Sequence, residues 1–256
     1  MTLQWISSLN KRQKTAVYCA DVSGAFDRVD TPRMVAKLQS LGVHAQLVSV
    51  FTSWLQQRAA FLVVEGSRSE ALQLANMVYQ GTVFGPTLWN LFYADASRAI
   101  RKKGFAELVY ADDLNAYKEF DGHTPNDTIV AQTMQCQSEL HAWGAANRVS
   151  FDPSKESMHV VSHVDPHSEA FRILVVTFDC KLLMATSVHE LVAELRWKIR
   201  TLLRATCFMS ISEQVLQFKA RLLSYVEYRT QVFTMPAAHS WTGSMQCREH
   251  VSERWA

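Results

Sequence analysis

Alternating and helical patterns of hydrophobic residues divide the chain into short strands and amphipathic helices. Residues 15–22 (TAVYCADV) are apolar and β-prone, and the turn-like SGAFD follows them. We predict a strand that places Asp21 at its carboxyl end. Residues 107–120 (ELVYADDLNAYKEF) predict a hairpin, and Gly85 with Pro86 opens a helix that continues to Gly104. Helices on one face of a largely antiparallel sheet predict an α+β fold.

Three more helical segments and four more strands follow from the same reasoning. Thr31 as N-cap and Pro32 at the first helical position predict a helix that ends at Gly42, and a second helix follows it. Asn126 or Asp127 caps a further predicted helix. Strands are expected over 156–162 and 171–179, and residues 59–81 predict a strand, a turn and a strand. The inner stripe of the helix after residue 126 is Ile129, Thr133, Cys136, Leu140 and Trp143.

The last part of the chain has a helical pattern again. Apolar residues from about 188 to 224 recur at helical spacing, beginning with Leu191 and Leu195. Arg196, Arg200 and Arg204 lie one turn apart beside this stripe. Such arginines could follow a phosphate backbone, although a charged face on a surface helix is the default interpretation. The tail beyond residue 236 shows no sustained period, and we expect it to be loosely ordered.

Composition and charge narrow the class of protein only slightly. The 256 residues are 48% hydrophobic and 20% charged, with a formal net charge of +2, so the overall charge does not indicate a nucleic-acid binder. The five cysteines are scattered without CxxC pairs, which argues against a disulfide framework or a four-cysteine zinc site. No run reaches the ~18 apolar residues of a membrane span. We expect an intracellular protein without a membrane partner.

Adjacent aspartates form the main candidate for chemistry. Asp112 and Asp113 repel each other, and a divalent metal is the usual source of compensating charge. Alone, such a pair is more often a solvated turn. Asp21 at a strand end, together with the glycine-flanked turn QGTVFGP, favours a metal site. Carboxylates from separate strands can hold two hard cations ~4 Å apart and stabilise the attacking and leaving oxygens of a phosphoryl transfer.

Four segments resemble the motifs of reverse transcriptases in order and approximate spacing. ADVSGAFDRV (20–29) resembles motif A, and QGTVFGPTLWNLFYAD (80–95) resembles motif B. YADD (110–113) resembles motif C, and VSFDPSKESMHVV (149–161) resembles motif D. Within these motifs, the similarity to the non-LTR retrotransposon (LINE-type) enzymes is greatest in the segments AFDRV, QGT, LWN and YADDLNAYK. The resemblance covers about residues 15–235 and implies a reverse-transcriptase-like palm followed by a partial helical thumb.

The resemblance also implies roles for individual residues. Asp21 and Asp112 would bind two catalytic Mg²⁺ ions, for which Mn²⁺ is expected to substitute, with Asp113 as the third acidic metal ligand. Phe26 would crowd the 2′-hydroxyl of a ribonucleotide and so favour deoxynucleotides; its structural alternative is a core aromatic. Lys155 would neutralise or protonate the departing pyrophosphate; its alternative is a solvated residue at a strand edge.

Four further residues would border the nucleotide. Gln80 and Gly81 match the motif B turn, where glycine allows the backbone to approach a ligand closely. Tyr110 and Ala111 would line the approach to the carboxylates. The chain departs from the family at Gly85, where serine is usual, and at Val175, where a glycine is usual in the hairpin that grips the primer end.

The resemblance predicts a division of the chain into domains. Residues 1–20 are expected to be a remnant of the fingers, 21–187 the palm with motifs A to E, 188–236 the partial thumb, and 237–256 the tail. In the family, a long fingers region precedes motif A, whereas here motif A begins about twenty residues from the start. We therefore expect a fragment of a longer polyprotein or a degenerate copy.

Three functional hypotheses remain at this point. The first is an RNA-directed DNA polymerase fragment that extends a DNA primer on an RNA template with dNTPs, with the rest of a retrotransposon polyprotein as a candidate partner. The second is a catalytically inactive, polymerase-derived domain that binds nucleic acid or protein. The third is an RNA-templated RNA polymerase, against which Phe26 argues. The family implies a location in the nucleus or cytoplasm.

Two other clusters have simpler interpretations. Asp95 lies on the apolar stripe of its predicted helix, and we expect a basic partner such as an arginine. His159, His163 and His167 recur every four residues, which on a helix would suggest zinc. Pro166 and the neighbouring valines predict strand and loop instead, so we reject a zinc site there.

Overall fold

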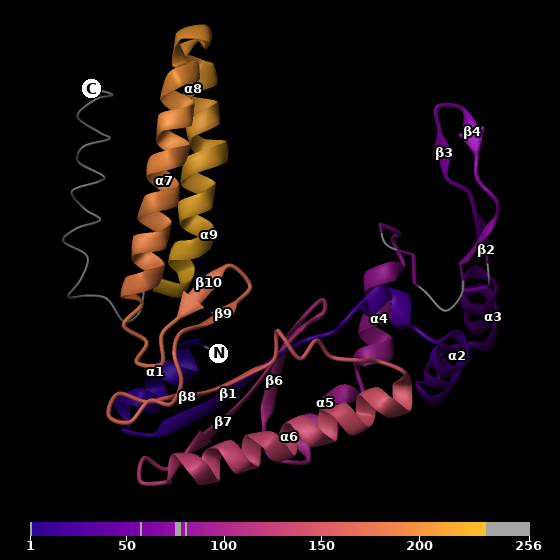
Figure 1. The fold of residues 1–256 in the computed structure, drawn as a ribbon, viewed down its shortest axis with the longest axis horizontal. Coiled ribbons are helices and arrows are strands. Elements are labelled where there is room, and N and C mark those ends of the chain that lie inside the picture. The colour runs from indigo at the N-terminus through magenta and orange to yellow at the C-terminus, as the bar shows by residue number, and fades with distance from the viewer. Residues whose placement is uncertain (1, 57, 75–77, 80, 234–256) are drawn as a thin grey trace. The chain divides into compact units, whose positions relative to one another are not determined.

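The computed structural model describes residues 2–56, 58–74, 78–79 and 81–233. The chain divides into two compact units. Unit 1 contains Met1–Thr15, Glu119–Thr124 and His159–Ala256, and unit 2 contains Ala16–Lys118 and Pro125–Met158. The structure contains helices and a sheet that includes an antiparallel hairpin, which confirms the predicted α+β class (Figure 1).

A four-stranded sheet carries the predicted motif A and motif C segments. Its strands are ordered β6-β7-β1-β8, and β6 pairs with β7 in the predicted antiparallel hairpin. Every residue of β1 before Asp21 is buried, which explains why its sequence is a nearly continuous apolar run. The strands are β1 (Lys14–Asp21), β6 (Ala106–Tyr110), β7 (Asp113–Phe120) and β8 (Ser157–Val161).

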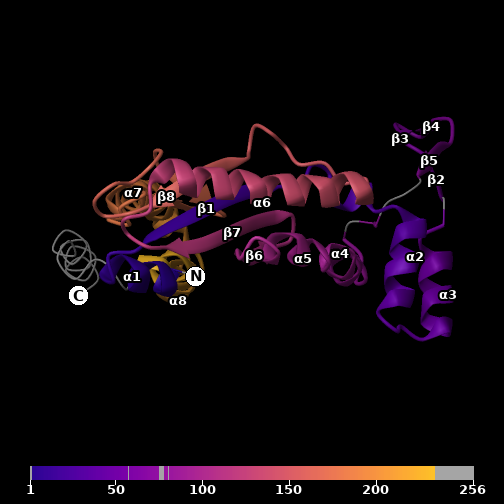
Figure 2. The ribbon, with the colours of Figure 1, turned by 90° about the horizontal axis from the view of Figure 1, so that it is seen from below.

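The helices of unit 2 support this sheet. Helix α6 runs along β1 and β7 in both views and packs on α5 (Figure 2). Of its predicted inner stripe, Ile129, Thr133, Cys136 and Leu140 are buried, whereas Trp143 is only half-buried. The helical elements of unit 2 are η1 (Ala25–Arg28), α2 (Thr31–Ser40), α3 (Ala45–Trp54), α4 (Gly85–Tyr93), α5 (Ala96–Arg101) and α6 (Asn126–Asn147).

Short strands follow α3. β2 (Arg58–Ala60) pairs antiparallel with β5 (Leu72–Leu74), and β3 (Val63–Val64) pairs with β4 (Ser67–Arg68). These pairs are exposed on most of their residues, so tertiary packing contributes little to holding them.

Helix boundaries in unit 2 differ from the sequence prediction at three places. The helix predicted from Gly85 to Gly104 is two helices, which break at Ala94–Asp95. The Asp95 carboxylate accepts hydrogen bonds from Lys37 Nζ at 2.7 Å and from Trp143 Nε1 at 2.8 Å, so it is tied to two other helices at the break. Asp30, not Thr31, caps α2 by accepting from the Arg33 N–H. Pro125 precedes α6 without a side-chain cap, contrary to the prediction for Asn126 or Asp127.

Unit 1 combines an N-terminal helix, a hairpin and a helical segment. Trp5 of α1 packs against Phe171 and Phe178 with ring centroids 6.1 and 5.8 Å apart. The single strand that the pattern predicted over 171–179 is a hairpin, β9–β10, as the family resemblance implied around Val175. The elements are α1 (Thr2–Asn10), β9 (Phe171–Ile173), β10 (Val176–Phe178), α7 (Ala185–Ala205), η2 (Thr206–Phe208), α8 (Ile211–Phe218), the π-helical turn η3 (Lys219–Leu223) and α9 (Ser224–Phe233).

The helical pattern after residue 188 is thus confirmed, although its helices begin at Ala185. The boundary predicted between palm and thumb at residue 188 stays a prediction, because both compact units are discontinuous in sequence. The predicted tail, 237–256, lies outside the described residues. Within the described part of the chain, no helix combines the length and apolar character that crossing a membrane requires.

Candidate active site

The end of β1 places Asp21 between two other predicted motifs of unit 2. The Val22 N–H donates to the Asp112 carbonyl at 3.3 Å, and the Asp152 N–H donates to the Asp21 carbonyl at 3.0 Å. These backbone bonds bring the motif A strand between motifs C and D. The site is therefore assembled by strand-end pairing rather than by long side chains.

The two-residue turn between β6 and β7 presents the adjacent aspartates. Tyr110 pairs with Asp113 at the end of the hairpin, leaving Ala111 and Asp112 in the turn. Ala111 has a φ of 54°, in the left-handed region that few non-glycine residues adopt. Its carbonyl accepts a hydrogen bond from Trp89 Nε1 at 2.7 Å, which helps hold the turn in this conformation. Tyr110 is 65% exposed beside it.

Electrostatic repulsion links the three aspartates. Partial burial raises the pKa of Asp113, and the charges of Asp112 and then Asp21 raise that pKa further, while Lys155 opposes them. Asp112 and Asp21 therefore lie close enough for their charges to act on the Asp113 carboxyl group. A concentration of negative charge is the expected property of a cation site.

Lys155 supplies the positive charge that contacts this group. Its Nζ donates to Asp21 Oδ2 at 2.6 Å, and the hydrogen bond to Asp21 raises the pKa of Lys155. The preceding turn is fixed by the Asp152 side chain, which accepts from the Ser154 N–H and hydroxyl. Lys155 is 60% exposed and Asp21 only 13%, so the cation meets the carboxylate from the solvent side.

The donor chemistry at this position suits a hard divalent cation, because its side chains are carboxylates and Mg²⁺ prefers oxygen ligands. In the described residues, however, no three His, Cys, Asp or Glu side chains are gathered closely enough to hold a metal ion. The Lys155 ammonium instead contacts Asp21. Metal binding by Asp21, Asp112 and Asp113 therefore stays a prediction, supported by ligand type and charge.

Phe26 lies half-buried in the segment after β1 and next to the motif B turn. Its ring centroid is 6.0 Å from that of Trp89, and its carbonyl accepts from the Val78 N–H at 2.8 Å. A Cβ added to Gly85 would lie 3.6 Å from the Phe26 ring and 3.2 Å from the Tyr79 carbonyl. The absence of a side chain at Gly85 thus matches close packing at the start of α4.

The remaining predicted nucleotide contacts are only partly described. Gly81 has a φ of 76°, so glycine suits the conformation that this turn requires. Gln80 lies outside the described residues. The structure brings Asp21, Phe26, Asp112, Asp113 and Lys155 into one unit through the contacts above, and their roles toward a nucleotide stay predictions.

Other predicted residues lie elsewhere or make different contacts. Arg196, Arg200 and Arg204 are exposed on α7 in unit 1 and form no ion pair with any residue that the structure describes. Asp95 pairs with Lys37, which confirms the expected basic partner, a lysine in this case. His159 is buried, stacks on Phe171 at 4.4 Å and contacts Ser168 through Nδ1, as a packed strand residue does.

Sequence reasoning gave Trp89 no role, although LWN was part of the motif B resemblance. The structure places this buried residue between the Phe26 ring and the Ala111 carbonyl, so it connects motifs A, B and C. A tryptophan predicted to be buried signals that its indole N–H needs a hydrogen-bond acceptor. Which residue supplies that acceptor depends on the tertiary structure.

Comparison with known proteins identifies the family. A family model described as reverse transcriptase (RNA-dependent DNA polymerase) matches residues 2–192. The chain belongs to the reverse transcriptase family. The match covers the whole four-stranded sheet and all the motifs noted above.

Relatives of this reverse transcriptase chain support the predicted non-LTR type. It is 26% identical over 256 residues to the RNA-directed DNA polymerase from mobile element jockey of Drosophila funebris, covering 91% of this chain and 27% of that protein. The Drosophila melanogaster protein of the same description is 26% identical over 244 residues, covering 85% and 26%. The chain therefore spans about a quarter of the length of these relatives.

A solved structure supports the fold. Apo telomerase from Candida tropicalis, truncated from its C-terminal domain, aligns with a TM-score of 0.54 at 10% identity, covering 71% of this chain and 38% of that one. At this identity the similarity shows the fold alone, and it confirms the predicted reverse-transcriptase-like architecture.

Proposed function

We propose that this chain carries the palm active site of an RNA-directed DNA polymerase, which extends a DNA primer 3′-hydroxyl on an RNA template with dNTPs. The observation that carries the proposal is the arrangement of Asp21, Asp112, Asp113 and Lys155 at adjoining strand ends, within the region that matches the family. The chain spans only about a quarter of the length of each relative, so its polymerase activity is a proposal.

The proposed chemistry assigns separate tasks to these groups. Asp21 and Asp112, with Asp113, would hold two Mg²⁺ ions, which when bound stabilise the attacking and leaving oxygens. Lys155 already lies 2.6 Å from Asp21 and remains protonated because that contact raises its pKa. It could move from Asp21 toward the departing pyrophosphate and donate a proton there.

Residues around the motif B turn would position the nucleotide. The Phe26 ring would exclude a 2′-hydroxyl, and the Gly81 backbone would border the base pair, as would Gln80 by family resemblance. Template RNA and primer DNA are the partners in this proposal, and a location in the nucleus or cytoplasm, drawn from the family resemblance, is part of it. Arg196, Arg200 and Arg204 would contribute phosphate contacts through their exposed face.

A second function has its own support. The Asp21 carboxylate is engaged by Lys155, and the described residues contain no three-ligand metal group. These observations favour a catalytically inactive domain that still binds nucleic acid or a protein.

Primer extension distinguishes the two. The full chain is incubated with an RNA template, a DNA primer and dNTPs, in Mg²⁺ and separately in Mn²⁺. We expect extension that disappears in Asp112→Ala and persists in Asp127→Ala, an exposed aspartate at the start of α6 that serves as the control. A folded protein that binds primer–template but never extends it would overturn the polymerase proposal and favour the binding domain.

A further inference from the structure

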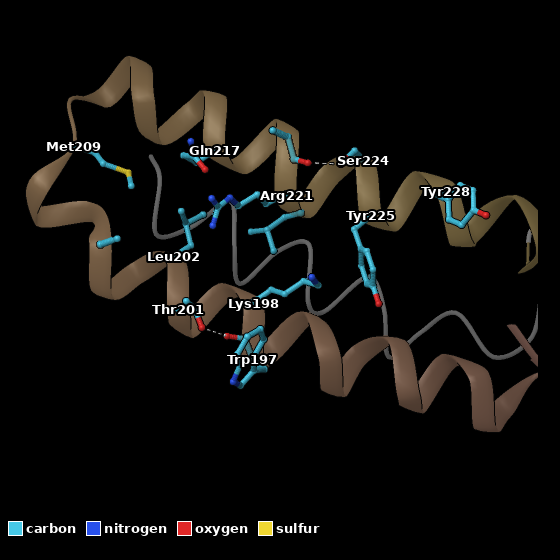
Figure 3. Close-up of a pocket in the computed structure, with 13 residues that line it drawn as sticks. Trp197, Lys198, Thr201, Leu202, Met209, Gln217, Arg221, Ser224, Tyr225 and Tyr228 are labelled. Carbon is cyan, nitrogen blue, oxygen red and sulfur yellow. Dashed lines mark hydrogen bonds between the residues drawn. The ribbon is translucent and has the colours of Figure 1, made fainter. Parts of the chain in front are cut away.

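A cleft between the helices of unit 1 combines aromatic rings with positive charge. Its volume is about 720 Å³, within the range of ligand pockets, and α7 forms one wall while the end of α8, the π turn η3 and α9 form the other (Figure 3). The described residues that line it include Trp197, Tyr225 and Tyr228 together with Lys198 and Arg221, but no aspartate or glutamate. This lining suits an anionic ligand with an aromatic part.

Two of the three rings are available to a ligand. Trp197 is 67% exposed and Tyr228 is 61% exposed. The Tyr225 ring is already engaged, because Lys198 Nζ lies 4.5 Å and the Arg229 guanidinium 4.8 Å from its centroid. Tyr225 therefore positions Lys198 in the cleft, and Trp197 and Tyr228 offer the free aromatic surfaces.

Arg221 is the second cation, and its position depends on an irregular turn. Residues Lys219–Leu223 form a π-helical turn, in which the Ser224 N–H donates to the Lys219 carbonyl. Arg221 and Lys198 extend into the space between the two walls (Figure 3). Arg221 is exposed and has no carboxylate partner among the described residues. Single π turns within α-helices are rare and often occur at functional sites.

We propose that this cleft binds an unpaired nucleotide of a single-stranded nucleic acid. The base would stack on Trp197 or Tyr228, and Arg221 and Lys198 would pair with the adjoining phosphates. Aromatic stacking combined with cation contacts is the general mode by which proteins hold single strands. Bases inside a duplex are already stacked on each other, so their faces are not available to these rings.

The proposal is independent of the polymerase reaction, because the cleft uses neither the aspartates nor a metal ion. Binding can therefore be measured with the full chain in EDTA. The probe is a fluorescein-labelled single strand of about eight nucleotides, within the usual site size for such binding. Fluorescence anisotropy compares this strand with the same sequence in a duplex.

Matched variants test the cleft itself. We expect Trp197→Ala to weaken single-strand binding about tenfold, and Trp197→Phe to retain most of it, since stacking is worth about 1–3 kcal/mol per base. Phe208→Ala is the control, because Phe208 is 88% exposed in η2, the turn after α7, but does not line the cleft. We expect Arg221→Gln to weaken binding severalfold and to reduce the salt dependence by about one phosphate contact. Lys219→Gln, two residues away and outside the lining, should change neither as much.

Several outcomes would overturn the proposal. Equal affinity for duplex and single strand, equal losses in the cleft and control variants, or wild-type binding by Trp197→Ala and Arg221→Gln would each do so. If the cleft substitutions released a bound acidic peptide but not the oligonucleotide, the cleft would be assigned to a protein partner instead. Because binding is measured in EDTA, where metal-dependent extension does not take place, a failure of catalysis and a failure of the cleft are distinguishable.

Discussion

Phe26 combines a packing role with a position beside the proposed nucleotide site. Its ring packs near Trp89 and Gly85, yet the residue is only half-buried. We expect Phe26→Val to increase the use of ribonucleotides relative to deoxynucleotides by about tenfold or more, since removing ring volume makes room for a 2′-hydroxyl. The measurement is kcat/KM for each nucleotide class in primer extension.

The control for this change is a substitution on the other side of the same contact. Trp89→Phe also removes aromatic volume, together with the hydrogen bond to Ala111, and should lower extension with both nucleotide classes without changing their ratio. Unchanged sugar selectivity in an active Phe26→Val protein would leave Phe26 as a core aromatic only.

Lys155 gives a second prediction at this scale. We expect Lys155→Gln to slow extension by roughly tenfold to a hundredfold through loss of the proton donor. Lys155→Arg keeps the charge beside Asp21 and should recover part of the rate. Contact with Asp21 raises the pKa of Lys155, so the charge pair is intact below the ordinary lysine pKa and is lost only as pH rises through the higher folded value. Single-turnover rates between pH 6 and 9 should therefore show no loss due to deprotonation of Lys155.

At the scale of elements, the β9–β10 hairpin has an unfavourable turn. Leu174 has a φ of 54°, a left-handed conformation that strains a non-glycine residue, and its side chain is 39% exposed. We expect Leu174→Gly to raise the free energy of unfolding by about 1 kcal/mol, as measured by urea denaturation. The hydrogen bond from Arg172 Nε to the Leu174 carbonyl involves the backbone and is retained.

The neighbouring residue supplies the control. Val175 is where the family usually has glycine, but Val175 is not among the residues with positive φ. Val175→Gly should lower stability, because it increases the entropy of the unfolded chain without relieving strain. If Val175→Gly raised the free energy of unfolding and Leu174→Gly did not, the strain would lie at residue 175.

The elements also show what the sequence could and could not predict. The apolar run of β1 and the alternation around Asp112 determine strands directly, and motif order determines which strand ends carry aspartates. The break between α4 and α5 was missed because it depends on Asp95 meeting Lys37 and Trp143 from other helices. The β9–β10 hairpin followed from the family resemblance but not from the hydrophobic pattern, because Leu174 is a poor turn residue. The π turn at Lys219–Leu223 interrupts a segment whose pattern is fully helical.

At the scale of the whole molecule, a net charge of +2 conceals local separation of charge. In unit 2 the charges of Asp112 and Asp21 act on Asp113, whereas the cleft of unit 1 has cations and no carboxylate among its described lining residues. Binding thus depends on the charge of local surfaces, which the net charge of the chain does not reveal. Sequence reasoning from composition alone could not find the cleft, because Trp197 and Arg221 meet only through helix packing.

Stability of the whole protein should depend on His159 in mild acid. Burial lowers the pKa of His159 to about 4 from an ordinary value of 6.5, with a smaller contribution from His167. The unfolded chain therefore binds a proton between pH 6.5 and about 4, whereas the folded chain does not, so stability falls as pH decreases through this window. Once the pH is below both pKa values, the free energy of unfolding has fallen by roughly 3 kcal/mol.

A variant that cannot titrate isolates this contribution. His159→Asn keeps a hydrogen-bonding group for Ser168 but cannot gain a proton, so it should be less stable than the wild type at pH 7 and lose less stability toward pH 4.5. His163→Asn, at an exposed position, should follow the wild-type pH dependence. Urea midpoints at pH 7, 5.5 and 4.5 provide the comparison. Because His159 stacks on Phe171, which also packs against Trp5, protonation would disturb contacts between β8, β9 and α1 within unit 1. A constant difference between wild type and His159→Asn at all three pH values would mean that the imidazole is already accessible to protons in the folded protein.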